Sequence, residues 1–398
     1  MDQAEQIRCM KLLMHRLDLG INVDAGGAVV NPVEAYTCAK RAADEWRLMF
    51  QFYPQVMGLS ADLPEPGSFI TSTELGKPLL LTRDKDGLFQ AFLNVCTHRG
   101  TVLVQEERGK KFSFNCPFHG WGFSNSGDLV SVPKENHFGP VEKPCYNPVR
   151  LTAQEKHGLL WVHPEPGQTF DLDALLGDLG DELDSWGFGK LSFGALETYQ
   201  TPMNWKLAID TFGETYHFPV LHKDTLGQNV YGNVQCYDIF ENNHRMLLCS
   251  KAIDLFRDLP EEEWDLLAAT IPVYYLFPNI QLIPSGRIPG RPKGEMSGAT
   301  LVRVYPNKDN PHESFSQVSF YTNTEIPQDF REGISDRLAG FSEIIRDEDY
   351  KAAATCHAGA TSGALQHFTF GRNEPALHHY HNTYNRVLGL DPLQSISN

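Results

Sequence analysis

Two short loops, each with one cysteine and one histidine, constrain the fold of this chain more than any other feature. The first loop reads Cys96-Thr97-His98, and the second, seventeen residues further on, reads Cys116-Pro117-Phe118-His119. Side chains that share one metal centre must be brought together, so the two loops should lie side by side. Gly100 and Gly120 follow the two pairs, where glycine lets the backbone turn tightly beside a metal centre. The spacing predicts a small domain built around one metal centre.

The mixed donors indicate which metal centre this is. A zinc site could use two Cys and two His, but common zinc spacings pair Cys with Cys and His with His. One of each per loop is typical of a [2Fe–2S] cluster with Cys96 and Cys116 on one iron and His98 and His119 on the other. Neutral imidazoles lower the negative charge of such a cluster and so raise its potential. The alternative is that the loops are two unrelated hairpins.

A second group of acids and histidines follows later in the chain. The apolar spacing predicts a helix over 204–217, with Asp210, Glu214 and His217 at i, i+4 and i+7 on one face. A proline two residues on interrupts this helix, so His222 arrives from the following turn. Taken alone, His217 and His222 could be two core histidines held by hydrogen bonds.

The two groups together resemble one known family. C-x-H-R-G followed by C-P-x-H-G-W is similar to the Rieske motif of the Rieske non-haem iron oxygenases, the aromatic-ring-hydroxylating type. Respiratory-complex Rieske proteins carry a disulfide across these loops, and neither loop here holds a third cysteine. Glu214, His217 and His222 resemble the mononuclear-iron motif of the same family, an acid, two residues, His, four residues and His. The resemblance runs from about Asn31 to the C-terminal helix.

The resemblance implies two cofactors, a [2Fe–2S] cluster and a mononuclear Fe(II). Its iron ligands would be His217, His222 and a distant carboxylate within Ile344–Tyr350, for which Asp349 is our first choice and Asp347 our second. Two histidines and one carboxylate leave positions on the iron open for O₂ and substrate.

The resemblance also gives Glu214 a role beside the iron. In the family this acid bonds the first iron histidine and the second Rieske histidine of a neighbouring subunit, here His217 and His119. A homotrimer or a higher multiple is therefore implied, alone or with a small beta subunit. Many ring dioxygenases have Asp at this position, and Glu resembles the branch that acts on carnitine and related quaternary amines. Thr211 stands where several members have Asn. We expect Glu214 and Asp210 to be the catalytic acids.

The fold class expected is α+β, because runs of strands are followed by helices. Residues 61–166 should form a small all-β Rieske domain. Residues 167–398 should form a larger catalytic domain, for which the resemblance implies an antiparallel sheet wrapped by helices (helix-grip, START-like). Residues 1–60 should pack on that domain, and the acidic stretch 167–190 suits a solvated connection. Further helices are expected at 31–53, 328–345 and 375–388, and strands at 78–82, 88–95, 112–115, 159–163, 245–250, 273–283, 300–304 and 315–322.

Three further features have ordinary structural interpretations. Residues 286–298, rich in Gly and Pro, should be an exposed loop, since they match no phosphate-loop pattern. His378, His379 and His381 should be partly exposed helix residues. Residues 273–283 could form an apolar pocket wall or an ordinary core strand.

The resemblance implies the terminal oxygenase component of a Rieske system, using O₂ to hydroxylate an aromatic or related small organic substrate. The sequence contains no GxGxxG and no plant-type ferredoxin cysteine run, so the NAD(P)H reductase should be a separate protein, acting directly or through a ferredoxin. Three alternatives stay open. The chain could be a Rieske monooxygenase that demethylates or cleaves a quaternary amine, a Rieske electron-transfer or ligand-binding protein, or a zinc-dependent binding protein.

The charge balance narrows the partners. There are 34 Lys and Arg against 50 Asp and Glu, a net charge of −16, which argues against nucleic acid and against anionic membranes. No apolar run approaches the roughly 20 residues that span a bilayer, and residues 1–16 lack a secretory hydrophobic segment. We expect the protein in the cytoplasm, where its eight cysteines are better read as metal ligands or core thiols than as disulfides.

Overall fold

The structure is a computed structural model that describes residues 1–287, 296–326 and 339–396. The chain divides into a small unit, Met49–Asp171, and a large unit, Met1–Leu48 with Leu172–Asn398. The sequence placed these boundaries at 60/61 and 166/167. Residues 49–60 fall in the small unit because β2 (Gln55–Leu59) pairs with β12 (Leu159–Val162) in an antiparallel sheet.

The small unit consists of three antiparallel sheets joined by turns and short 3₁₀ segments. Its core contains Trp121 and Phe123, and the same buried cluster encloses Cys96 and Cys116. The apolar strands predicted at the start of this unit are present as β4 and β5. Besides β2 and β12, the strands of this unit are β3 (Ser68–Ser72), β4 (Leu79–Arg83), β5 (Phe89–Leu93), β6 (Arg108–Lys110), β7 (Ser113–Asn115), β8 (Gly122–Ser124), β9 (Leu129–Ser131), β10 (Arg150–Leu151) and β11 (Ala153–Lys156).

The large unit is built on a seven-stranded antiparallel sheet in the order β13-β19-β18-β17-β16-β15-β14. The strand predicted over 273–283 is two strands, because residues 277–279 form the turn between them. The central strands of this sheet are largely buried, and such strands hold side chains in fixed positions. The strands are β13 (Leu191–Thr201), β14 (Val230–Phe240), β15 (Asn243–Ser250), β16 (Thr270–Leu276), β17 (Ile280–Arg287), β18 (Met296–Asn307) and β19 (Asn310–Asn323).

The helix predicted over 31–53 is wrong in its first turn and broken after it. Its first two residues belong to β1 (Val29–Pro32), which pairs with β20 (His367–Phe370) and β21 (Gln394–Ser395). Strand pairing across more than 300 residues thus overrides the local helical pattern, and the proline sits at the strand end. Short helices follow: α2 (Glu34–Thr37), α3 (Ala39–Glu45) and a π-helix (Trp46–Gln51).

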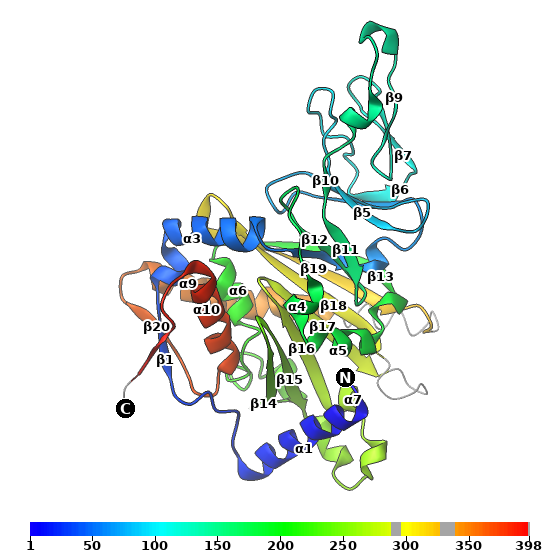
Figure 1. Cartoon of the computed structure of the whole chain (residues 1–398). Coiled ribbons are helices and arrows are strands. Elements are labelled where there is room, and N and C mark those ends of the chain that lie inside the picture. The colour runs from blue at the N-terminus through cyan, green and yellow to red at the C-terminus, as the bar shows by residue number, and fades with distance from the viewer. Residues whose placement is uncertain (288–295, 327–338, 397–398) are drawn as a thin grey trace. The chain divides into compact units, whose positions relative to one another are not determined.

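The solvated connection predicted over 167–190 is also wrong. This stretch forms α4 (Leu172–Leu176) and α5 (Leu179–Trp186), both labelled in Figure 1. Leu172, Leu176 and Leu183 are buried, so these helices pack on the large unit and only part of their acidic surface meets water.

Three helices frame the polar residues of the large unit. The helix predicted over 204–217 stops early, as α6 (Trp205–Asp210), whereas α10 (Pro375–Leu388) has the bounds predicted for it. A π-helix (Ile345–Asp349) leads into α9 (Tyr350–Thr361). Of the helix predicted over 328–345, residues 339–344 are helical and 328–338 lie outside the described residues, as does most of the loop expected at 286–298.

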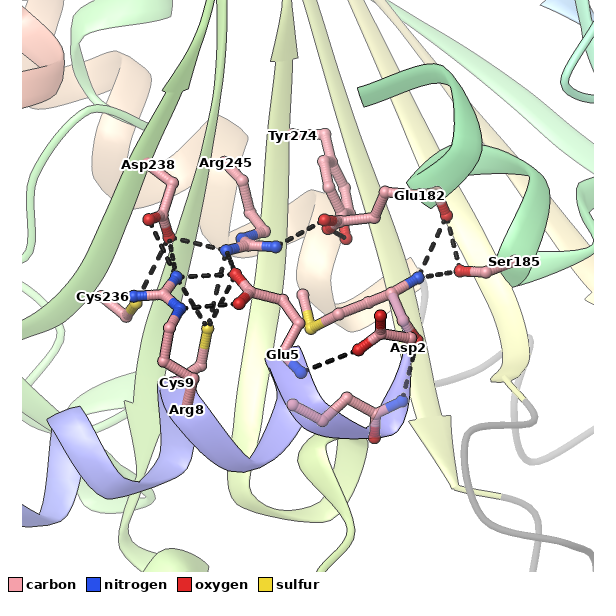
Figure 2. Close-up of polar contacts among 12 residues, drawn as sticks. Asp2, Glu5, Arg8, Cys9, Glu182, Ser185, Cys236, Asp238, Arg245 and Tyr274 are labelled. Carbon is pink, nitrogen blue, oxygen red and sulfur yellow. Dashed lines mark hydrogen bonds and ion pairs between the residues drawn. The ribbon is translucent and has the colours of Figure 1, made fainter. Parts of the chain in front are cut away.

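Helix α1 (Gln3–Leu19) lies beside β14 and the short α7 (Leu266–Ala269), as the blue helix in Figure 1 shows. It is fixed to the sheet by Arg245 of β15, whose side chain is fully buried and pairs with Glu5, Glu182 and Asp238 (Figure 2).

Within the described ranges we find no helix with the length and apolarity needed to cross a membrane.

Candidate functional site

The two Cys/His loops of the small unit share one backbone geometry. In each, the cysteine N–H donates to the carbonyl five residues later, at 2.8 Å. In each, the cysteine carbonyl accepts from the N–H of the glycine four residues later, at 2.9 Å. Gly100 and Gly120 close these turns with φ of +78° and +71°, which other residues rarely adopt. The matching turns bring the two cysteines into one buried cluster and the two histidine rings next to each other.

The side chains of these loops converge. The rings of His98 and His119 lie 4.6 Å apart between centroids, and Trp121 stacks on His98 at 4.8 Å. Cys96 and Cys116 are both buried, and burial raises the pKa of the Cys96 thiol. The buried Nδ1 of His119 has no hydrogen-bond partner among the described residues. Two buried sulfurs and an orphaned ring nitrogen fit a [2Fe–2S] cluster between the loops.

The second donor set lies in the large unit. Three atoms converge there: Nε2 of His217, Nε2 of His222 and Oδ1 of Asp349. The two ring nitrogens are 3.1 Å apart, and the carboxylate oxygen lies 3.4 Å from His217 and 3.2 Å from His222. Two imidazoles and one carboxylate on one side of a point form the ligand set of a non-haem Fe(II) site with open positions.

The other ring nitrogen of each histidine meets a carboxylate. Nδ1 of His217 contacts Oε1 of Glu214, and Nδ1 of His222 lies 2.6 Å from Oε2 of Glu348. Thr225 donates to the same Glu348 oxygen at 2.9 Å. A carboxylate on Nδ1 keeps the proton there and leaves Nε2 as the free lone pair for a metal. Glu348 was not predicted, because it reaches His222 from a position 126 residues further along the chain.

The π-helix explains how adjacent acids serve different partners. Glu348 and Asp349 occupy its last two positions, so one carboxylate reaches Nδ1 and the next reaches Nε2 of the same ring. Asp347 points elsewhere: its side chain is 42% exposed and pairs with Arg346 and Lys351. Of the two carboxylates considered for iron, the structure thus brings Asp349 to the histidines. π-Helical turns are frequent at functional sites.

The charge balance of this group favours a cation. Burial lowers the pKa of His217, but the carboxylates of Asp349 and Glu214 outweigh it and raise that pKa to about 9. Burial raises the pKa of Asp349, but the hydrogen bonds and positive charge of the two histidines outweigh this effect and hold that pKa below its usual value. The surrounding carboxylates therefore favour positive charge at this point, which a divalent ion can supply.

Asp210 lies apart from this group. Because α6 ends at Asp210, the chain turns before Glu214, and the two acids do not share a helix face as the i, i+4 spacing predicted. Asp210 instead accepts hydrogen bonds from Tyr36 and His381. His381 was expected to be partly exposed, yet it is fully buried, while His378 and His379 are half-buried.

A narrow apolar pocket opens beside the metal-binding group. Its volume is about 40 Å³, and Val273 and Ile283 line it, so the segment 273–283 does contribute a wall. Thr211 and Glu214 also reach it, together with His222 and Asp349. Its other lining residues are Phe212, Phe218, Leu226, Met246, Leu248, Ile271, Phe341 and Ile345. An apolar pocket with a few polar groups at one end is the usual form of a small-molecule site.

The fold and the two donor sets together define a protein with a Rieske-type domain and a catalytic domain with the ligand set of a mononuclear iron site. Two family models match it: the Rieske [2Fe–2S] domain over residues 54–147, and the ring hydroxylating alpha subunit (catalytic domain) over residues 188–390. The chain belongs to the ring-hydroxylating alpha-subunit family.

Curated relatives match the chain over part of its length. The alpha subunit of chlorobenzene dioxygenase from Cupriavidus sp. (strain PS12) is 32% identical over 171 residues, 41% of this chain and 37% of that protein. The oxygenase subunit of carnitine monooxygenase from Acinetobacter baumannii is 31% identical over 164 residues, 41% of this chain and 44% of that protein. The matched segments thus span less than half of either relative.

Solved structures match over most of the chain. The quaternary ammonium Rieske monooxygenase CntA in complex with L-carnitine covers 89% of this chain and 95% of its own, with a TM-score of 0.73 at 19% identity. Naphthalene 1,2-dioxygenase from Rhodococcus sp. covers 96% and 98%, with a TM-score of 0.71 at 18% identity. At these identities the likeness establishes the fold.

Proposed function

We propose that the chain is the terminal oxygenase component of a Rieske non-haem iron system. It would use O₂ and electrons from a separate NAD(P)H reductase, directly or through a ferredoxin, to hydroxylate an aromatic or related organic substrate. One observation carries this proposal: a single chain holds a thiolate–imidazole donor set and an imidazole–carboxylate donor set. A Rieske electron carrier needs only the first set.

Each donor set has a defined task. When bound, the cluster supplies single electrons and the mononuclear Fe(II) activates O₂. Cys96, Cys116, His98 and His119 would hold the cluster, and the Nε2 atoms of His217 and His222 with Oδ1 of Asp349 would hold the iron. Glu214 and Glu348 would keep the two imidazoles oriented by holding the Nδ1 protons.

The pocket favours an aromatic substrate. Its apolar lining would exclude water and hold a neutral ring beside the iron-binding atoms. No Lys or Arg is among the described lining residues, so a substrate carboxylate would find no cationic partner there. Three phenylalanines, Phe212, Phe218 and Phe341, supply ring faces.

A quaternary amine is the second candidate substrate. Aromatic faces attract such cations, and Glu214 reaches the pocket with a carboxylate. The likeness to carnitine monooxygenase, which shows in both comparisons, adds to this candidate. The reaction would then be oxidative N-demethylation or C–N cleavage.

The first experiment measures cofactors and product together. Anaerobically prepared protein is assayed for iron and acid-labile sulfide and examined by EPR after reduction. It is then supplied with a surrogate reductase and ¹⁸O₂, and arenes are compared with quaternary amines. We expect a Rieske signal and label in a hydroxylated arene. Zinc in place of iron would refute the proposal, and label only with amines would move it to the second substrate class.

A second experiment addresses the bridge between subunits. We propose that Glu214 also accepts a hydrogen bond from His119 of a neighbouring copy, in a homotrimer or a higher multiple, with or without a small beta subunit. Glu348 is the matched control, because it holds the other iron histidine in the same way. Glu214→Gln should slow cluster-to-iron transfer in a single turnover by more than about tenfold beyond Glu348→Gln. Equal rates in the two variants, or a strict monomer in light scattering, would contradict the bridge.

A further inference from the structure

Helix α10 presses one face against the turn that leads to Glu214. The side chains of Leu377 and Tyr380 lie so close to Gly213 that a Cβ there would be 2.8 Å from each. Real Cβ atoms essentially never come so near, so a larger residue at this position would have to displace Leu377 and the ring of Tyr380. Tyr380 is itself held by Gln281 of β17, whose side-chain amide donates to the phenol oxygen at 3.0 Å. The backbone before Glu214 thus rests directly on α10.

The same face of α10 carries His381, which holds Asp210 at the other end of this turn. Nε2 of His381 lies 2.9 Å from Oδ1 of Asp210. Nδ2 of Asn31 lies 3.0 Å from the other ring nitrogen, and since an amide nitrogen can only donate, the ring proton belongs on Nε2. The hydroxyl of Tyr36 donates to Oδ2 of Asp210 at 2.7 Å. Asn31, Tyr36 and His381 have no exposed surface.

Each oxygen of Asp210 is therefore held by a buried donor from a different element. Burial and the charge of Asp210 raise the pKa of Tyr36, so its phenol stays a donor. Removing the His381 N–H would leave Oδ1 of Asp210 without its donor. Because the Asp210 side chain is only 12% exposed, this loss would destabilise the position of Asp210. Asp210 also accepts the N–H of Gly213 on its backbone carbonyl at 2.9 Å, so a shift of Asp210 moves the turn.

The far end of the turn is fixed by Glu214 itself. Its carboxylate accepts the backbone N–H groups of Tyr216 and His217 as well as the His217 ring contact. The segment from Asp210 to His217 is thus held at one end by His381 and at the other by Glu214. Its middle, Gly213, is clamped by α10.

We infer that His381 is a positioning residue for Glu214: through Asp210 it fixes the turn that aims Glu214 at His217, and so controls electron delivery to the mononuclear site. This inference rests on the proposed function, because it gives His381 a part in a transfer that only an oxygenase performs. It requires no charge change on His381.

The test compares three variants of the holoenzyme. His381→Leu removes the N–H at similar size, and His381→Gln keeps an amide N–H that can reach Asp210. His378→Leu is the matched control, since His378 lies on the same helix but contacts the Gly371 carbonyl instead. Two quantities are measured: cluster reoxidation in a single turnover at equal iron content, and hydrogen exchange of residues 211–218 without substrate.

We expect His381→Leu to slow reoxidation about tenfold to a hundredfold, as a small misplacement of a transfer group does, and to speed exchange in 211–218. His381→Gln should restore most of both, and His378→Leu should match the wild type. Wild-type values in His381→Leu, or equal losses in His381→Gln, would overturn the inference while leaving the proposed function standing. If His381→Leu does not fold, Asp210→Asn weakens the same bond and is read in the same way. A wild-type protein without any cluster-to-iron transfer would instead refute the proposed function.

Discussion

Two clusters of polar side chains in the large unit each bring three metal-ligating atoms within 4.8 Å of one another, among the residues that the structure describes. One is the His217, His222 and Asp349 group beside the pocket. The other is Cys9 of helix α1 with Cys236 and Asp238 of β14, drawn in Figure 2. By ligand type alone, the second group, with two thiols, would be the softer and stronger metal site.

The two clusters differ in the cations that already surround them. Asp238 accepts from Arg8 at 2.8 Å and from Arg245 at 2.6 Å, so its carboxylate is already neutralised by guanidinium groups. Both arginines also lie 3.5 Å from the sulfur of Cys9. The neighbouring Cys236 thiol, together with burial, raises the pKa of Cys9, which keeps the thiol protonated.

In the part of the chain that the structure describes, the ion pairs of His217, His222 and Asp349 involve carboxylates and imidazoles, and no Lys or Arg takes part in them. A cluster that has its own cations is a structural ion-pair network, whereas one that lacks them is completed by a metal ion. The charge of the surroundings therefore separates the two clusters better than the count of ligands.

The largest expected effect separates the two clusters by metal content. Asp349→Ala should weaken binding of the mononuclear iron by more than about a hundredfold, because even outer-shell partners are worth that much. Asp347→Ala is the matched control, since this acid pairs with Arg346 and Lys351 at the surface. Iron per chain is measured by elemental analysis, with the cluster signal as internal reference. Iron loss in Asp347→Ala with retention in Asp349→Ala would reverse the assignment.

How much of this could be read from the sequence depends on the range of the interactions involved. The Cys96–His98 and Cys116–His119 loops follow from local spacing, and α10 has a proline in its first turn and a left-handed Gly389 as its C-cap. Local signals of this kind predict a helix to the residue. The roles of the cluster and iron residues stay predictions, although the structure brings both sets together.

The misses come from long-range contacts. Glu348 reaches His222 from a π-helix, where 3.6-residue periodicity gives the wrong face. Residues 31 and 32 join β1 because β20, far along the chain, supplies the pairing partner. Asp210 was placed on the face of Glu214, but α6 ends at Asp210, and the chain then turns through Gly213, which packs against α10. None of these partners is visible in the surrounding sequence.

The second prediction tests the ion-pair cluster as a structural device. Arg245→Met should lower the free energy of unfolding by about 3–5 kcal/mol, because it leaves the buried carboxylate of Glu182 without its arginine partner. Arg8→Met removes an exposed cation of the same cluster and should cost at most about 1 kcal/mol. Urea unfolding followed by circular dichroism measures both. Comparable losses would show that the buried and the exposed arginine do not differ, and lost iron in folded Arg245→Met would undermine the separation of the clusters.

The third prediction concerns the two thiols. Cys236→Ala should cost about 1 kcal/mol of stability, as small core truncations do, and should change neither iron nor zinc content. The thiol of Cys236 donates to Asp238 at 3.5 Å and is buried beside Cys9. Elemental analysis of the variant and of wild type grown in added zinc gives the comparison. Stoichiometric zinc in the wild type that disappears in Cys236→Ala would make this cluster a second metal site.

The smallest effect is a pH dependence at the edge of the same cluster. A hydrogen bond from the Arg8 guanidinium, aided by Arg245 and opposed by burial, lowers the pKa of Glu5 to about 2. A carboxyl with a lowered pKa stabilises the fold above its unfolded value, near 4.5, and loses that contribution as the pH falls toward 2. Wild type should exceed Glu5→Gln by less than about 1 kcal/mol at neutral pH, because the Arg8 pair is solvent-screened.

The gap between wild type and Glu5→Gln should stay nearly constant down to about pH 5, fall by about half near pH 3 and be mostly gone near about pH 2. Unfolding midpoints across that range measure it, and Asp347→Ala, at a surface acid outside the cluster, shows how a carboxyl unrelated to Arg245 behaves. A gap that widens on acidification would mean that Glu5 is protonated in the folded protein. Arg245 would then lack a charged partner on α1, and the ion pair that joins α1 to β15 would not exist.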